Sequence, residues 1–400
     1  MFSPIQIGPM TVKNRFVVPP MGNNFANSDG TWSDESVAYY GERAKGQFGL
    51  ITIEATVVHK GAKGGPKKPC LYDDNSIESL KKITDACHEE GAKVSIQLQN
   101  AGPEGNAKNA GAPIQAATAI ASADGRDIPE EVSTEKVYEL VKGYGEAAER
   151  AMKGGSDAVE IHMAHGYLVN SFMSPRTNKR VDEFGGSFEN RSRLMLDITK
   201  LIAENTDKSV ILASRLGICD MIAKPYGFGM ADDGQTPDFT EANELIGKLS
   251  ALGVSLIDMT MGSPYFNPYI NRPQNKGERI PPEHPLVGVD RLIHGAEAIQ
   301  KANPSVAVVG TGYSYLREFA PYAAAGALER GYSTLVGFGR MAFAYDRFAD
   351  DFISGNTDKS KVCLACSKCT EIMRAGGTTG CPLRDQEIYL PIYRRLCMKK

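Results

Sequence analysis

The chain has 400 residues, of which 42% are hydrophobic and 23% are charged, and its formal net charge is −3. This composition is typical of a globular protein with ample material for a core, as one large domain with an appendage or as two domains. The small net charge gives no reason to expect a nucleic-acid partner or a membrane surface, and we find no secretory leader and no apolar run of about eighteen residues, so we expect a cytoplasmic protein.

Short β-prone runs alternate with helical patterns along most of the chain. Eight such runs precede residue 340, at residues 16–21, 49–54, 93–98, 158–162, 210–215, 254–259, 306–310 and 334–337. Apolar residues at helical spacing fall between most of them, for example at residues 77–90, 134–153, 188–204, 240–252, 286–301 and 316–325. This alternation predicts an α/β fold, a (β/α)8 TIM barrel, over residues 1–350.

Polar residues stand where several of these strands should end. Gln97 and Gln99 close the third run, His162 closes the fourth and Arg215 closes the fifth. The C-terminal ends of the strands form the face of such a barrel that carries the active site. Because a glutamine or an arginine is rarely buried in a barrel without a polar partner, we expect Gln97 and Arg215 to contact a polar ligand.

The fourth strand is followed by a concentration of ionisable side chains, His162, His165 and Tyr167. Two imidazoles and one phenol could bind and protonate a single substrate oxygen. The tyrosine would be the acid, because a phenol is protonated at neutral pH. The alternative is that each histidine only bonds a backbone carbonyl at the strand end.

Three motifs surround this cluster. H-x-x-H-G-Y-L at residues 162–168 is followed by N-x-F-x-S-P-R-T-N-K-R at 170–180 and by D-x-x-G-G-S-x-x-N-R at 182–191. This pattern resembles the old yellow enzyme family of flavin-dependent ene-reductases. The resemblance implies that His162 and His165 hold the electron-withdrawing group of the substrate over FMN, and that Tyr167 delivers the proton.

The same resemblance implies flavin contacts along the barrel rim. Gln97 would bond the pyrimidine edge of FMN, and Arg215 would lie beside N1 and the O2 carbonyl, where a fixed cation favours the anionic reduced flavin. Further cofactor contacts are implied for Pro20, Met21, Gly22 and Ala55. At position 22 many relatives carry a threonine or cysteine that tunes the flavin, so the reduction potential does not carry over to this chain.

Glycine pairs follow the last two predicted strands. Gly310 and Gly312 follow the seventh strand, and Gly337 and Gly339 follow the eighth, with Arg340 directly after them. Barrels commonly hold a phosphate there on backbone N–H groups. A tight turn would explain either pair alone, but both pairs together with Arg340 as a bidentate partner predict a phosphate site.

Three connections are longer than a barrel requires, at residues 100–133, 218–238 and 260–285. Long loops on the catalytic face usually shape the substrate pocket. We therefore expect Tyr265 to contact the substrate, with packing between loops as the alternative. Arg176 aligns with a family position that can face the site, and a loop-anchoring salt bridge is its alternative.

The last 40 residues are rich in cysteine. A C-x2-C-x2-C sequence is followed after eleven residues by a Cys-Pro pair, and this spacing predicts a [4Fe–4S] segment at residues 351–400 with four ligands: Cys363, Cys366, Cys369 and Cys381. Zinc is the alternative, although structural zinc usually takes two CxxC pairs. The arrangement resembles the iron–sulfur subgroup of old yellow enzymes that includes 2,4-dienoyl-CoA reductase and trimethylamine dehydrogenase. Cys397 has no predicted role.

These features predict a flavin-dependent ene-reductase that reduces an activated C=C bond of a small molecule, with hydride from FMN N5 and a proton from Tyr167. Electrons would come directly from NAD(P)H or, through the cluster, from a separate donor protein, since no GxGxxG fingerprint follows a strand. One alternative is an amine or other dehydrogenase that passes electrons from FMN to the cluster. Another is a flavin-free barrel with a zinc tail that acts as a binding module. Whether the chain forms a homo-oligomer is left open.

Overall fold

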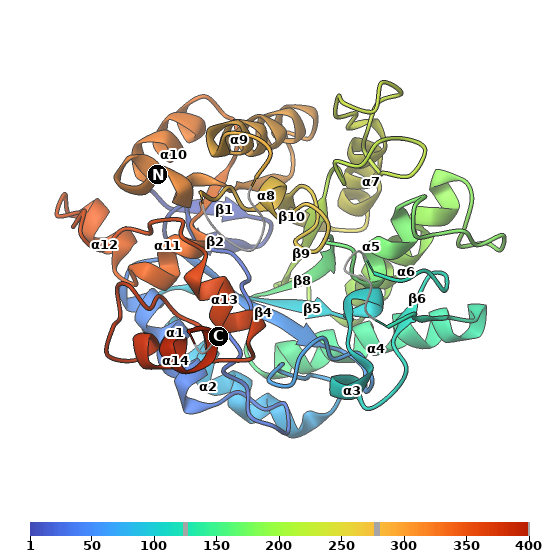
Figure 1. Cartoon of the computed structure of the whole chain (residues 1–400), viewed down its shortest axis with the longest axis horizontal. Coiled ribbons are helices and arrows are strands. Elements are labelled where there is room, and N and C mark those ends of the chain that lie inside the picture. Colours follow the sequence, from blue (N-terminus) through green and yellow to red (C-terminus); the bar gives the residue numbers. More distant parts are fainter. Residues whose placement is uncertain (123–126, 276–280, 399–400) are drawn as a thin grey trace.

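The computed structural model of the chain describes residues 1–122, 127–275 and 281–398 (Figure 1). Eight parallel strands form a closed barrel in the order β10-β11-β12-β3-β4-β5-β8-β9. Their bounds are β3 (Phe16–Val18), β4 (Leu50–Val57), β5 (Lys93–Gln99), β8 (Ala158–Met163), β9 (Ile211–Gly217), β10 (Val254–Thr260), β11 (Ala307–Gly310) and β12 (Leu335–Gly337). The predicted (β/α)8 barrel is confirmed.

An N-terminal hairpin closes one end of the barrel. Strands β1 (Ile5–Ile7) and β2 (Met10–Val12) pair antiparallel. Their side chains Ile7, Met10 and Val12 pack in one buried cluster with residues such as Leu50 and Ala158, which begin barrel strands. Burial of this apolar surface fixes the hairpin under the N-terminal ends of the strands. The βα loops lie at the opposite end of the barrel, where the strands have their C-terminal ends.

Helices surround the barrel, as Figure 1 shows. The longer ones are α1 (Asp34–Lys45), α2 (Ile77–His88), α4 (Thr134–Lys153), α6 (Phe188–Asn205), α7 (Thr240–Ala251), α9 (Pro285–Ala302) and α10 (Ala320–Glu329). The side chains of Ser33, Ser133 and Ser187 accept hydrogen bonds from backbone N–H groups at the starts of α1, α4 and α6. Such caps satisfy donors that the helix itself leaves unpaired.

Several predicted boundaries are wrong by three or four residues. Strand β3 ends at Val18 rather than at residue 21, and α10 ends at Glu329 rather than at residue 325. Strand β4 continues three residues beyond the predicted end at 54, and its register to β5 shifts between Ile53 and Thr56. A local irregularity of this kind has no signal in an apolar run. Helix α10 begins at Ala320 rather than at residue 316, because Pro321 lacks an N–H and restricts the turn before it. The preceding residues form the 3-10 segment η3 (Tyr313–Phe319).

Several short helices and strands lie within the loops on the C-terminal face of the barrel. After β4 comes η1 (Asp74–Ser76), and after β5 come η2 (Gly102–Glu104), α3 (Ala107–Ala110), β6 (Gln115–Ala116) and β7 (Glu130–Glu131). Helix α5 (Leu168–Met173) follows β8, and α8 (Pro268–Asn271) follows β10. These elements anchor the long connections above the barrel mouth.

The C-terminal segment folds back onto the barrel. It contains α11 (Gly339–Ala344), α12 (Phe348–Ile353), α13 (Lys368–Arg374) and α14 (Tyr389–Cys397), drawn in orange and red in Figure 1. Asn24 donates a hydrogen bond of 3.0 Å to the carbonyl of Met373, and the backbone N–H of Thr379 donates one of 2.7 Å to the carbonyl of Asn23. The residues after α12 therefore lie against the loop that follows β3. In the three described ranges, no helix has the length and apolarity needed to cross a membrane.

Candidate active site

His162, His165 and Tyr167 come together at the C-terminal end of β8. His162 lies at the end of the strand, and the loop turns sharply at His165, whose φ is 68°. His162 Nε2 and His165 Nδ1 are 3.0 Å apart, and His165 Nε2 is 3.1 Å from Thr260 Oγ1. The rings of His162 and Tyr167 lie edge to face with centroids 4.7 Å apart. The three predicted side chains thus form one contiguous group.

Burial and neighbouring charge keep both imidazoles neutral. Burial lowers the pKa of His162 well below its usual value, and His165 and Arg215 lower it further. Burial also lowers the pKa of His165, with Arg215 and Arg272 as additional causes. A neutral imidazole still carries one N–H donor, so the pair can donate hydrogen bonds but holds no positive charge at neutral pH.

Tyr167 faces a second tyrosine from a different loop. Its hydroxyl lies 2.9 Å from the hydroxyl of Tyr265, which belongs to the long connection after β10. The two rings meet edge to face with centroids 5.8 Å apart. The structure therefore places Tyr265 in contact with the predicted proton donor.

These residues line one cavity, which we call the histidine cavity. Nine of the predicted site residues border it: Pro20, Gly22, Ala55, Gln97, His162, His165, Tyr167, Arg215 and Tyr265. They come from six strands or the loops after them, far apart in the sequence. A common cavity is what joint action on one ligand requires.

Gln97 and Arg215 already have protein partners, so the argument that burial alone demands a ligand was wrong. Gln97 Nε2 donates a 2.7 Å hydrogen bond to Glu160 Oε1, and Arg215 Nη1 pairs with Asp258 Oδ2. The barrel interior is therefore not wholly apolar, because these four side chains form a polar layer under the histidine cavity. The Nε atom of Arg215 nevertheless remains buried without a hydrogen-bond partner.

The two carboxyl groups of this layer influence each other. Burial raises the pKa of Glu160, and the charge of Asp258 raises it further. Burial likewise raises the pKa of Asp258, while Arg215 opposes this shift. Because one guanidinium faces two buried carboxyl groups, the arrangement favours retention of one proton and a net charge near zero.

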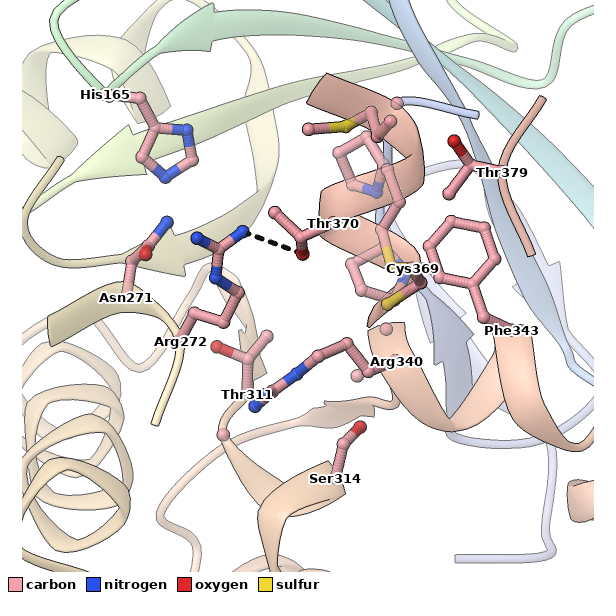
Figure 2. Close-up of a pocket in the computed structure, with 18 of the residues that line it drawn as sticks. His165, Asn271, Arg272, Thr311, Ser314, Arg340, Phe343, Cys369, Thr370 and Thr379 are labelled. Atoms are coloured by element: carbon pink, nitrogen blue, oxygen red, sulfur yellow. Dashed lines mark hydrogen bonds between the residues drawn. The ribbon is translucent and has the colours of Figure 1, made fainter. Parts of the chain in front are cut away.

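A second cavity, the Arg340 cavity, adjoins the first (Figure 2). The predicted residues that border it are Pro20, Met21, Gly22, His165, Arg215, Gly312, Gly337, Gly339, Arg340 and Cys369. A Cβ atom at Gly339 would lie only 2.8 Å from Met21 Sδ, so a larger residue would clash with Met21 at this wall of the cavity. Arg340 Nη2 donates to the Pro273 carbonyl at 2.7 Å, while its Nη1 is buried without a partner. Gly310 ends β11 and does not border this cavity.

A model of the NADH:flavin oxidoreductase / NADH oxidase family matches residues 1–350. The chain belongs to this family. It is 36% identical over 247 residues to NADPH dehydrogenase of Bacillus subtilis (strain 168), a match that covers 58% of this chain and 72% of the relative. The family resemblance predicted from the motifs is confirmed, and the flavin-free barrel is excluded.

Two solved structures superpose over most of the chain. A 2-naphthoyl-CoA reductase in complex with 2-naphthoyl-CoA gives a TM-score of 0.83 at 26% identity, covering 96% of this chain and 56% of that one. The old yellow enzyme homologue from Zymomonas mobilis gives 0.70 at 25% identity, with 89% and 93% covered. This chain thus spans little more than half the length of the naphthoyl-CoA reductase.

This member of the NADH:flavin oxidoreductase family is an FMN-dependent oxidoreductase, and its residues fit FMN. The Arg340 cavity offers an unpaired guanidinium N–H and the backbone of Gly312 and Gly339, which carries no side chain, and both are suited to a phosphate. The neighbouring histidine cavity offers Gln97 and Arg215 for a polar ring, together with the rim residues Pro20, Gly22 and Ala55. The sequence had not identified Asn271, Arg272, Thr311 or Ser314, which also border the Arg340 cavity.

The four cysteines of the predicted cluster border a third cavity, the thiol cavity. Arg340, Phe343 and Cys369 border both this cavity and the Arg340 cavity. Ala365 has a φ of 52°, and its N–H lies 3.3 Å from Cys363 Sγ, a contact that stabilises a thiolate. Burial raises the pKa of Cys369 to about 12, and Cys363 contributes to the shift. Within residues 1–122, 127–275 and 281–398, no three His, Cys, Asp or Glu side chains are grouped to hold a single metal ion.

Arg176 and Cys397 lie apart from these cavities. Arg176 borders a small pocket with Asp220 and Phe266, and its guanidinium carbon is 5.3 Å from the centroid of the Phe266 ring. Cys397, at the end of α14, does not border the thiol cavity. The structure therefore does not bring Arg176 to the histidines and tyrosines.

The neutral histidines predict how stability depends on pH. An unfolded histidine has a pKa of about 6.5, and both folded values lie below it, so the unfolded chain binds more protons as the pH falls below about 6.5. The free energy of unfolding should therefore be fully retained above that pH and decrease toward about pH 5. Urea unfolding of the FMN-loaded enzyme at several pH values measures this decrease. The double variant His162→Asn, His165→Asn should show a flatter dependence in this window, and an identical slope would contradict the assignment.

Proposed function

We propose that this protein reduces an activated C=C bond of a small molecule. The observation that carries the proposal is that Tyr167, His162 and His165 border the same cavity as Gln97, Arg215 and the rim residues. A proton donor and a pair of hydrogen-bond donors thus face the place suited to the flavin ring. The name of one similar structure, 2-naphthoyl-CoA reductase, and that of the relative NADPH dehydrogenase agree with reduction of an unsaturated compound at the expense of NADPH.

Each side chain has a defined task in this proposal. When bound, FMN supplies the hydride. Tyr167 holds its phenolic proton for the α-carbon of the substrate, and the Tyr265 hydroxyl at 2.9 Å orients it. The neutral imidazoles donate to the substrate carbonyl and stabilise enolate charge as it develops, once the bond between His162 Nε2 and His165 Nδ1 opens. Gln97 and Arg215 hold the edge of the flavin ring.

We further propose that residues 351–400 hold a [4Fe–4S] cluster beside the FMN barrel of residues 1–350. Cys363, Cys366, Cys369 and Cys381 would be its ligands, because all four border one cavity. The cluster supplies single electrons when bound. The shared wall formed by Phe343 and Cys369 leaves little protein between the two sites. A separate donor protein is then an alternative to NAD(P)H as the source of electrons.

The amine dehydrogenase hypothesis fits less well. Tyr167 and Tyr265 would supply aromatic rings for a cationic amine. However, the cavity they border carries four cationic residues and no Asp or Glu among the described residues that line it. Lys68 and Arg215 are paired with carboxylates, but in the described part of the chain Arg272 bonds only a neutral hydroxyl, and repulsion from its charge opposes the binding of an ammonium group.

One experiment separates the two reactions. The holoenzyme is reduced anaerobically with NADPH or dithionite and mixed with enones, enoyl thioesters and unsaturated steroids, and in parallel the oxidised enzyme is mixed with amines. We expect an unsaturated compound to restore the absorbance of oxidised FMN and to yield its saturated product by mass spectrometry. Bleaching of oxidised FMN by amines, with no reoxidation by any unsaturated compound, would overturn the proposal.

A further inference from the structure

The charges around the histidine cavity are one-sided. Four cationic residues border it, Lys68, Arg215, Arg272 and Arg374, and no aspartate or glutamate does so among the described lining residues. The two histidines add no charge of their own, because their pKa values are lowered. A substrate that enters this cavity therefore meets a positive surface.

Two of these cations form ion pairs with carboxylates that do not border the cavity. Lys68 Nζ lies 2.9 Å from Glu54 Oε2, and Arg215 pairs with Asp258. Arg374 donates to the Pro264 carbonyl at 3.2 Å.

Arg272 differs from the other cations in its partners. Its Nη1 donates at 3.2 Å to the hydroxyl of Thr370, which is a neutral group. Its Nε atom is buried and has no hydrogen-bond partner. Burial and the charges of Arg340 and Arg374 lower the pKa of Arg272 to about 10, which leaves it charged at neutral pH. A buried guanidinium in this situation is stabilised by an anion.

Arg272 borders the same cavity as His165 and Tyr167, so its charge can act on a ligand that contacts these residues. The residue follows α8 on the same connection that carries Tyr265, and it borders both the histidine cavity and the Arg340 cavity. Figure 2 shows its guanidinium on the same side of the cavity as His165, with Arg340 extending from a different element below it. Arg340 has its own unpaired N–H beside the glycine backbone, so the phosphate of FMN has a partner without Arg272.

We propose that Arg272 binds an anionic group of the substrate, so that the enzyme acts on unsaturated compounds that carry a carboxylate. This inference rests on the proposed reduction of an activated C=C bond and narrows its substrate class. The planar guanidinium of Arg272 matches a carboxylate with two parallel hydrogen bonds. Such a contact fixes the far end of the substrate while the histidines and Tyr167 act on the unsaturated end.

A matched pair of substrates tests this proposal on the unmodified holoenzyme. The probes are 6-oxohept-4-enoate and its methyl ester, in which two CH2 groups separate the carboxylate from the enone, so that the two compounds share the same activated C=C bond and differ in charge. We expect the KM of the carboxylate to be about tenfold or more below that of the ester, because a hydrogen bond to a charged group contributes about 1.5–3 kcal/mol. A saturated analogue, 6-oxoheptanoate, should also perturb the absorption of oxidised FMN at lower concentration than its ester.

Variants of Arg272 assign the preference to this residue. Arg272→Met should raise the KM of the carboxylate about tenfold or more and leave the KM of the ester unchanged. Arg272→Lys should restore part of the preference. Arg330→Met removes an exposed arginine at the end of α10 and should behave like the wild type. The FMN content of each variant, measured as released flavin fluorescence, should not change.

The outcomes separate this inference from the function on which it rests. Equal KM values for the two probes in the wild type, or loss of FMN from Arg272→Met with an unchanged ratio of KM values, would overturn the role of Arg272 but not the reduction. Failure of both probes and of every other unsaturated compound to reoxidise the flavin would instead overturn the reduction itself.

Discussion

Tyr167→Phe should slow the reoxidation of reduced FMN by an unsaturated substrate about 10²–10⁴-fold, which is the usual contribution of a positioned acid. The variant removes only the hydroxyl, and the ring can keep its contact of 4.7 Å with His162. Reduction of FMN by NADPH does not require this proton, so its rate should be unchanged. Anaerobic stopped-flow absorbance measures the two half-reactions separately.

Tyr265→Phe is the matched comparison, because its hydroxyl lies 2.9 Å from that of Tyr167 and either can be the donor. If Tyr167 transfers the proton, loss of the Tyr265 hydroxyl should slow reoxidation less than loss of the Tyr167 hydroxyl. Equal reoxidation rates in Tyr167→Phe and the wild type would remove Tyr167 from the mechanism. A larger effect in Tyr265→Phe would transfer the role to that residue.

The barrel was predictable from local pattern, whereas its irregularities were not. Each parallel strand is buried on both faces, so it appears in the sequence as a short apolar run between helical patterns. The extension of β4 to Val57 depends on pairing with β5 and with residues near Cys70, which the run itself does not encode. The local periodicity of apolar residues therefore predicts which elements exist more reliably than it predicts where they end.

The candidate site was partly predictable for a similar reason. His162, His165 and Tyr167 stand within one motif, so the sequence shows their spacing directly. Glu160 and Asp258 are single acidic residues inside apolar strands, and this was the signal that could have indicated a polar layer. The polar layer was not predicted, because the prediction considered only residues at the strand ends.

Arg272 had no comparable signal. It lies in a long loop among aromatic and proline residues, and its importance follows from its burial beside Arg340 and Arg374. Only the fold brings these three residues, which are distant in sequence, to one place. Charge balance in a cavity is a property of the tertiary structure, and no spacing rule reveals it.

Cys369→Ser should abolish or severely deplete the cluster that we propose for the C-terminal segment. Cys369 borders both the thiol cavity and the Arg340 cavity. A serine hydroxyl is a poor ligand for iron compared with a thiolate, so the anaerobically purified variant should lose most of its iron, from about four atoms per chain. Iron analysis, acid-labile sulfide and visible absorption measure this loss.

Cys397→Ser provides the matched control, because this cysteine does not border the thiol cavity. It should keep the iron content and the FMN of the wild type, since the predicted flavin contacts come from the barrel rim and the Arg340 cavity, and Cys397 does not border that cavity. Iron retained in Cys369→Ser would contradict the ligand assignment. Stoichiometric zinc with no iron in the wild type would show that the thiols hold a different metal, because a zinc site uses the same thiolates without their redox chemistry.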